Sequence, residues 1–161
     1  MTREGIADNV HKGEVKAEEG YIAPDFTVSD LEGKRVRLSD FHGQVVVINL
    51  WATWCAPCRV EMPSIENLYR RFRSEGLTVL AVSFDKGRDE AVRAFAKEKN
   101  LSFPILLDHD MEVENKYQTL TIPSTFVVDK HGMIAARVDG AKNWESPETF
   151  KAIEFLLNRK P

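Results

Sequence analysis

The chain has 161 residues, a hydrophobic content of 43% and a formal net charge of −3. This length suits one well-formed hydrophobic core, and the small negative charge gives no reason to expect nucleic acid or an anionic membrane as a partner. No apolar run approaches the length of a signal-peptide core or a membrane-spanning helix, so we expect either a cytosolic protein or a chain shown without its export segment.

The N-terminal residues differ in composition from the rest of the chain. Residues 1–20 are polar and densely charged, with few apolar side chains. Such a segment buries too little apolar surface to fold by itself. We therefore predict a flexible leader over residues 1–20, followed by one domain over residues 21–161.

Strands and helices alternate along the predicted domain. The nearly uninterrupted apolar run at 45–51 is typical of a strand buried on both faces, and Gly76 marks the end of a helix before a second such run. Helical spacing of apolar residues identifies the helices. The predicted strands are 45–51, 77–84, 104–107, 126–129 and 134–138, and the predicted helices are 59–72, 88–99, 112–117 and 149–158. This order favours a mixed α/β sandwich.

Cys55 and Cys58 are the only cysteines, and they lie between the first buried strand and the helix that follows it. Residues three apart in a first helical turn are close enough to form a disulfide with little backbone movement. Unpaired N–H groups at a helix N-terminus favour a thiolate over a thiol. We therefore expect Cys55, at the exposed side of the helix start, to be the attacking nucleophile and Cys58 the resolving thiol. Pro57 stiffens the loop between them.

Two other uses of this cysteine pair are less consistent with the sequence. A zinc site normally needs four ligands, and the histidines have no ligand spacing relative to the pair. The four histidines are His11, His42, His109 and His131. A purely structural disulfide over so short a loop constrains the unfolded chain little. We therefore expect a reversible redox pair and neither a bound metal nor another cofactor.

The segment 49–63, with the sequence NLWATWCAPCRVEMP, resembles the active-site signature of the TlpA/ResA-like thiol-disulfide oxidoreductases of the thioredoxin superfamily. Residues 23–26 and 38–44 are similar to the N-terminal hairpin and turn that this family shares with the peroxiredoxins of the AhpC/TSA type. The resemblance implies a thioredoxin-like sandwich, with a central mixed β-sheet flanked by helices and an N-terminal β-hairpin. It also implies a helix-strand insertion over residues 88–107.

The same resemblance implies which residues meet the substrate. The proline that matches Pro123 is cis in thioredoxin-like proteins, packs against the cysteines and leaves the backbone at Ile122 free to pair with an extended substrate. Without the resemblance, a trans bond is the expectation, because cis accounts for only about one X-Pro bond in twenty. Trp54 is expected to line the substrate surface, together with Ala56 and Pro57 between the cysteines.

Two polar residues near the cysteines have implied roles in proton transfer. The glutamate that matches Glu61 in ResA-like proteins tunes cysteine acidity, whereas a helical glutamate is ordinarily solvated surface. Asn49 occupies the place where thioredoxin has a buried, proton-accepting aspartate. Because an asparagine side chain does not titrate, we expect Asn49 to form hydrogen bonds in the core and Glu61 to take over the base role.

The resemblance implies a thiol-disulfide oxidoreductase that reduces disulfides of partner proteins outside the cytoplasm, with apocytochrome c cysteines as one class of target. It also implies an upstream membrane thiol electron donor and a chain whose N-terminal signal or anchor is not shown. A cytoplasmic location is the alternative. No heptad or exposed apolar stripe indicates a dimer, so we expect a monomer.

Two alternative functions stay open at this point. A peroxiredoxin-like thiol peroxidase normally carries a threonine and a proline before its reactive cysteine, where this chain has Ala52 and Ile48. Its resolving cysteine is also normally farther away. A copper chaperone of this fold class uses a spacing one residue longer. A thioredoxin-fold binding module without turnover is the second alternative, although such modules have usually lost a cysteine.

Overall fold

The computed structural model describes residues 13–161, in which seven strands form one mixed sheet. The order across the sheet is β2-β1-β5-β4-β3-β6-β7. The strands are β1 (Thr27–Asp30), β2 (Arg35–Arg37), β3 (Val45–Trp51), β4 (Leu77–Ser83), β5 (Ile105–Leu107), β6 (Ser124–Val128) and β7 (Ile134–Asp139). The helices are α1 (Ala56–Phe72), α2 (Asp89–Glu98), α3 (Glu112–Tyr117) and α4 (Pro147–Leu157), with short 3-10 turns η1 (Leu38–Phe41) and η2 (Arg73–Glu75).

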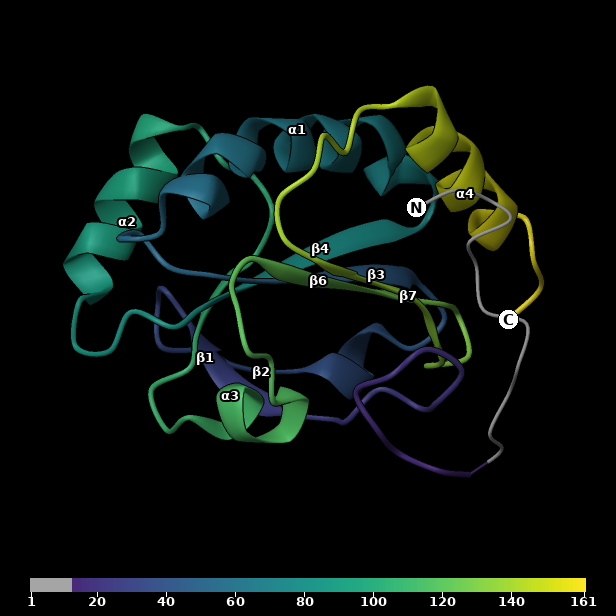
Figure 1. The fold of residues 1–161 in the computed structure, drawn as a ribbon, viewed down its shortest axis with the longest axis horizontal. Helices are drawn as coiled ribbons and strands as arrows, with labels where there is room; N and C mark the ends of the chain where they lie inside the picture. Colours follow the sequence, from purple (N-terminus) through teal and green to yellow (C-terminus); the bar gives the residue numbers. More distant parts are fainter. Residues whose placement is uncertain (1–12) are drawn as a thin grey trace.

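The central strand β3 is buried along its whole length because helices cover both faces of the sheet. Side chains alternate along a strand, so Val45 and Val47 face the core beneath α1 and α4, whereas Val46 and Ile48 face the core that contains α3. Figure 1 shows α1, α2 and α4 above the sheet and α3 below it. β3 and β4 run parallel and are connected through α1, the ordinary arrangement of a β-α-β unit.

The predicted architecture is confirmed. β1 and β2 form the expected antiparallel N-terminal hairpin, and β3 and α3 have the predicted bounds. The predicted insertion is the segment of α2 and β5, in which β5 joins the sheet between β4 and β1. The active-site helix begins at Ala56, three residues before the predicted start, because Pro57 is accommodated in the first turn.

Residues 13–20 differ from the loose leader predicted for this part of the chain. Ala17 is buried, and its carbonyl oxygen accepts a 3.0 Å hydrogen bond from Nη1 of Arg137 in β7. The backbone N–H of Gly20 donates to the carbonyl of Ile134 at 2.9 Å. Residues 13–20 are therefore held against the domain by strand β7. Residues 1–12 of the predicted leader lie outside the described residues, and the domain boundary at residue 20 stays a prediction.

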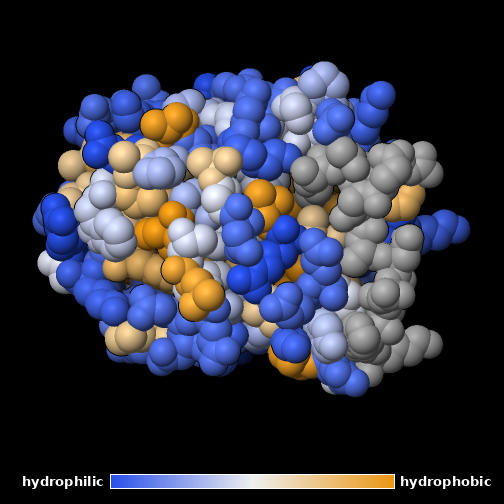
Figure 2. Space-filling view, in the orientation of Figure 1, coloured by the Kyte–Doolittle hydropathy of each residue, from blue (hydrophilic) through white to orange (hydrophobic). Residues whose placement is uncertain are grey.

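The surface seen in Figure 2 is mostly hydrophilic, with apolar side chains in small groups between charged ones. Within residues 13–161, the large apolar side chains that are clearly exposed are those of Val15, Trp54, Val60 and Leu120. None of the helices in this part of the chain has both the length and the apolar character needed to cross a membrane.

Candidate active site

Cys55 and Cys58 form a disulfide where β3 passes into α1. Their Cα atoms are 5.3 Å apart, within the usual range for a disulfide. Cys55 is the N-cap of α1, and its sulfur accepts a hydrogen bond from the backbone N–H of Cys58 at 3.3 Å. The positive end of the α1 dipole and this N–H both stabilise negative charge on Sγ of Cys55 when the disulfide opens.

The two sulfurs differ in access. Cys58 is fully buried, and Cys55 retains 6% of its surface. Cys55 is thus less exposed than its position at the helix start suggested, because the 119–123 loop covers one side of it. Of the two cysteines, Cys55 is still the one with solvent-exposed surface. A protein disulfide approaching this edge can therefore reach Cys55 before Cys58.

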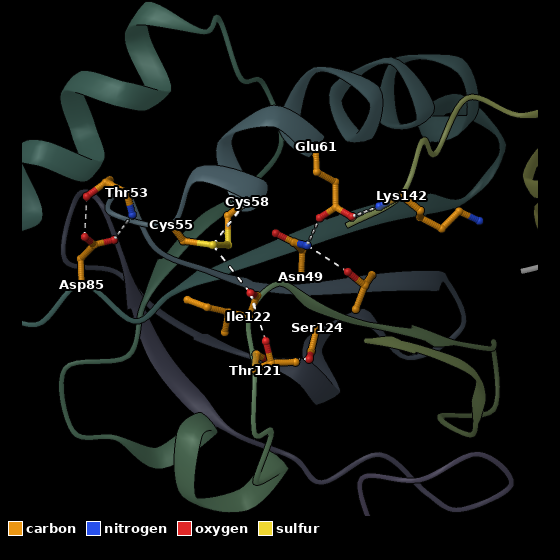
Figure 3. The surroundings of a disulfide bond; sticks show 11 residues. Asn49, Thr53, Cys55, Cys58, Glu61, Asp85, Thr121, Ile122, Ser124 and Lys142 are labelled. Atoms are coloured by element: carbon orange, nitrogen blue, oxygen red, sulfur yellow. Dashed lines mark hydrogen bonds between the residues drawn. A yellow bond between two sulfur atoms is a disulfide. The ribbon is translucent and has the colours of Figure 1, made fainter. Parts of the chain in front are cut away.

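The loop that enters β6 lies beside the disulfide (Figure 3). The carbonyl oxygen of Ile122 is 3.7 Å from Sγ of Cys55, so a thiol formed there has an acceptor within reach. The Ile122–Pro123 peptide bond is cis, as the resemblance implied. Ser124 fixes the start of β6, because its hydroxyl donates to the carbonyl of Thr121 at 2.8 Å. The loop is therefore positioned by β6 and presents backbone directly to Cys55.

A hollow next to the disulfide is lined by apolar and charged side chains. Its apolar lining includes Trp54, which is 61% exposed, together with Leu120 and Ile122. The remaining lining residues are Phe84, Lys86, Arg88, Glu114, Thr119 and Thr121. Ala56 and Pro57, between the cysteines, are exposed on the same turn of chain. Trp54 and Ala56 are the chain neighbours of Cys55, and the carbonyl of Ile122 approaches its sulfur. Contact of these residues, Pro57 and Pro123 with a substrate stays a prediction.

Glu61 is not on the solvated surface, since only 3% of it is exposed. Its Oε1 accepts from Nδ2 of Asn49 at 3.1 Å, and its Oε2 accepts from Nε1 of Trp144 and the backbone N–H of Lys142, both at 2.9 Å. Burial raises the pKa of Glu61, and these hydrogen bonds to the carboxylate offset part of that rise. A buried carboxyl with a raised pKa near a redox pair is suited to proton exchange.

Asn49 forms the hydrogen bonds in the core that the sequence predicted. Its side chain faces the same side of β3 as Val47 and is fully buried. Besides donating to Glu61, Nδ2 donates to Oγ1 of Thr125 on β6 at 2.9 Å. The amide thus connects strands β3 and β6 to helix α1.

Asp85 is a buried acid of the site that the sequence analysis did not identify. It follows β4, and its Oδ2 accepts from the backbone N–H of Thr53 and from the hydroxyl of Ser83, both at 2.8 Å. Its Oδ1 accepts from the hydroxyl of Thr53 at 2.5 Å. The carboxylate thus fixes the loop two residues before Cys55. The position of Asp85 in the sequence contains a signal for this role. Asp85 directly follows a predicted strand parallel to β3, and the carboxyl ends of parallel strands meet at one edge of the sheet.

Within residues 13–161, no group of three or more histidine, cysteine or acidic side chains is arranged to hold a metal ion. The redox-active group of the site is the disulfide itself.

Comparison with known proteins identifies the family. Residues 20–137 match the AhpC/TSA family. The chain is 38% identical over 137 residues to the thiol-disulfide oxidoreductase ResA of Bacillus thuringiensis subsp. konkukian, covering 85% of this chain and 79% of ResA. The chain belongs to the AhpC/TSA family, as a ResA-type thiol-disulfide oxidoreductase. ResA of Geobacillus thermodenitrificans is 40% identical over 126 residues, which are 78% of this chain and 72% of that one.

Solved structures agree with this assignment to the ResA type. The thioredoxin domain of a thiol-disulfide oxidoreductase from Bacteroides vulgatus superposes with a TM-score of 0.76 at 29% identity, covering 86% of this chain and 97% of that domain. StoA from Bacillus subtilis superposes with a TM-score of 0.66 at 27% identity, covering 76% of this chain and 92% of the StoA chain. The predicted resemblance, fold class and enzyme class are therefore confirmed.

Proposed function

We propose that this ResA-type protein works as a reductant of disulfides in partner proteins outside the cytoplasm. The observation that carries the proposal is the difference between the two sulfurs: Cys55 is the accessible one and lies at the N-cap of α1, whereas Cys58 is fully buried. Such a pair separates the roles of attack and resolution. The proposed reaction uses the Cys55–Cys58 disulfide as its redox group and needs neither a metal nor another cofactor.

The proposed reaction has two exchanges. The thiolate of Cys55 attacks one sulfur of the substrate disulfide, forms a mixed disulfide and expels the other substrate sulfur as a thiolate, which takes up a proton. Cys58 then loses its proton and attacks Sγ of Cys55, which releases the second substrate thiol and closes the Cys55–Cys58 disulfide. The substrate gains two electrons and two protons, and a membrane dithiol donor returns them to this protein.

Glu61 is proposed to set the acidity of the cysteines and to exchange protons during the reaction. It lies one helical turn beyond Cys58 on α1, so the two side chains share a face of the helix. Burial raises its pKa, which brings a carboxyl closer to the pH at which it both accepts and releases protons.

Substrate binding is assigned to the surface around Cys55. Trp54 supplies an exposed aromatic face, and Ala56 and Pro57 continue it on α1. Ile122 and Pro123 supply the backbone on the other side of Cys55, where an extended substrate chain is proposed to pair. Apocytochrome c with a disulfide between its haem-binding cysteines is the proposed target, as the resemblance of the active-site segment implies. We propose that the protein acts as a monomer.

The roles of the two cysteines are tested by trapping. Reduced Cys58→Ser protein, mixed with insulin that has its disulfides intact, should accumulate a mixed disulfide through Cys55, because the resolving thiol is missing. Cys55→Ser protein is the matched control and should accumulate none. A mixed disulfide in the Cys55→Ser protein alone would reverse the roles.

The direction of electron flow is tested by equilibrium titration of the cysteine pair against thiol buffers, read by tryptophan fluorescence. A reversible two-electron transition near about −250 mV or lower is expected for a reductant. A transition near about −120 mV would identify an oxidant instead. Absence of a reversible transition would overturn the proposed redox function.

A further inference from the structure

The side-chain oxygen of Asn49 is a buried acceptor without a donor. Asn49 has no exposed surface, and no group within residues 13–161 donates a hydrogen bond to its Oδ1. Buried polar atoms are nearly always hydrogen-bonded, so such an atom needs an explanation. The described part of the disulfide form thus has no donor for Oδ1, whereas reduction of the disulfide creates two thiol donors.

The orientation of the Asn49 amide is set by its nitrogen. Nδ2 donates to Oε1 of Glu61 at 3.1 Å and to Oγ1 of Thr125 at 2.9 Å, and both of these partners are oxygen atoms. A flipped amide would place Oδ1 against the Glu61 carboxylate and lose the bond between them. Oδ1 is therefore turned away from Glu61 and Thr125.

Cys58 lies on the side toward which Oδ1 is turned. Glu61 is one turn along α1 from Cys58, so the side chains of both residues project from one face of the helix, and Asn49 binds Glu61 on that face. In Figure 3 the oxygen of Asn49 points toward the sulfur of Cys58. Cys58 has no exposed surface, so a thiol formed there has no contact with solvent.

We infer that Asn49 is the acceptor for the Cys58 thiol in the reduced protein and thereby stabilises the dithiol state. A dithiol that reduces the protein breaks the Cys55–Cys58 bond, transfers two electrons and two protons to the sulfurs and becomes a disulfide itself. Cys58 then carries an S–H donor where the disulfide had none, and Oδ1 of Asn49 receives it. Asn49 is thus a positioning residue for the resolving thiol. This inference rests on the proposed redox function.

Glu61 and Thr125 have a place in the same arrangement. The carboxylate of Glu61 fixes which way the amide faces, because a carboxylate accepts only from the nitrogen end, whereas the hydroxyl of Thr125 is able to pair with either end. The acceptor therefore needs no rotation when the disulfide opens. Trp51 Nε1 is the other unpartnered buried polar atom within residues 13–161, and it is a donor two residues along β3. Neither atom has a hydrogen-bond partner within residues 13–161, so the two do not pair with each other.

Infrared spectroscopy of a single-thiol variant tests the contact. Cys55→Ala leaves Cys58 as the only thiol in the chain and adds no new hydroxyl. Its S–H stretching band is expected at the lower wavenumber of a hydrogen-bonded thiol. Asn49→Leu in the same background should return the band to the position of a free thiol. Thr125→Val in that background is the matched control, since it removes a partner of Nδ2 and leaves Oδ1 in place.

Several results overturn the inference. A band at the position of a free thiol in the Cys55→Ala protein would overturn it. This measurement keeps Asn49 in place, so it is valid even if the Asn49→Leu variant folds poorly. A band that stays at the same wavenumber after Asn49→Leu would also overturn the inference. That result is expected if a water molecule, and not Cys58, donates the hydrogen bond to Oδ1. This measurement needs no turnover, so it is independent of the proposed redox function.

The energetic consequence is tested in the chain with both cysteines. Asn49→Leu should lower the equilibrium constant for reduction by dithiothreitol by roughly fivefold, the effect of one lost hydrogen bond, whereas Thr125→Val should leave it within about twofold. Equal constants for Asn49→Leu and the unaltered protein would contradict the inference while leaving a working redox pair. Loss of any reversible transition in the unaltered protein would instead contradict the proposed function.

Discussion

The carboxylate of Asp85 holds Thr53 at two points, through the backbone N–H at 2.8 Å and the hydroxyl at 2.5 Å. Asp85 itself is buried at the end of β4, and Thr53 belongs to the loop that leads from β3 into the cysteine pair. Two parallel strands are thereby tied together at the edge where Cys55 is presented. This contact makes the geometry of the redox loop depend on an acid that is distant in the sequence.

Asp85→Ala should destabilise the oxidised protein by about 2 to 3 kcal/mol, because charge-assisted hydrogen bonds are lost and their donors at Thr53 and Ser83 are left without an acceptor. Urea denaturation followed by circular dichroism measures this loss. Asp110→Ala removes the same charge from an exposed position and should change the free energy of unfolding by less than about 0.5 kcal/mol. Equal effects of the two variants would contradict a special role for Asp85.

Cys55 should react faster than Cys58 with iodoacetamide in the reduced protein near neutral pH. The N-cap position favours the thiolate of Cys55, and Cys58 is fully buried. We expect a rate ratio of about ten or more. Alkylation of the Cys55→Ser and Cys58→Ser variants, followed by mass spectrometry, measures the two rates separately. Equal rates, or a faster Cys58, would reject the proposed assignment of nucleophile and resolving thiol.

Glu61→Gln should change how stability depends on pH. Burial raises the pKa of Glu61 from its ordinary value of 4.5, so the folded protein binds this proton more tightly than the unfolded chain. The free energy of unfolding therefore falls as pH rises from the unfolded pKa through the folded pKa. Because glutamine does not titrate, the Glu61→Gln variant should gain stability relative to the unaltered protein across that window.

Urea denaturation at a series of pH values measures this difference between the Glu61→Gln variant and the unaltered protein. Glu98→Gln, on the exposed side of α2, controls for the loss of one negative charge. The same Glu61→Gln protein should show an altered pH profile of Cys55 alkylation, if Glu61 sets cysteine acidity as proposed. An unchanged profile would limit Glu61 to a structural role.

Trp54→Ala should slow the reduction of insulin by roughly fivefold, since an exposed aromatic wall beside the reacting sulfur is removed. Stability should change by less than about 0.5 kcal/mol, because the side chain is mostly exposed. Val60→Ala is a matched control, as it removes an exposed apolar side chain from α1. The rate with a small disulfide such as hydroxyethyl disulfide should be unchanged. An equal loss with both substrates would indicate a change in the cysteines themselves.

Local patterns in the sequence predicted much of the fold and the redox pair. The apolar run of β3, the helical spacing in α3 and the cysteine pair at the start of a helix are each contained in a few consecutive residues. Local patterns are reliable here because strand alternation, capping and the proximity of residues three apart depend on the nearby backbone alone. The start of α1 was less well predicted, because the proline in its first turn resembles a loop residue.

The surroundings of the cysteine pair depend on contacts that no local pattern contains. Glu61 and Trp144 are 83 residues apart in the sequence, yet the indole of Trp144 donates to the carboxylate in the core. Asn49 meets Thr125 across 76 residues, and Asp85 meets Thr53 across 32. The burial, hydrogen-bond partners and charge environment of a side chain arise from packing between elements. A glutamate on a helix is therefore expected on the surface until the fold is known.

The α/β fold class and the dithiol at a strand-to-helix junction are predictable from the printed residues, because apolar periodicity and cysteine spacing are local properties. The burial of Glu61, the contact of Asp85 with the redox loop and the lack of a donor for Oδ1 of Asn49 within residues 13–161 are visible only in the folded chain. Desolvation and hydrogen-bond pairing depend on which distant residues pack together, and no local pattern contains that information.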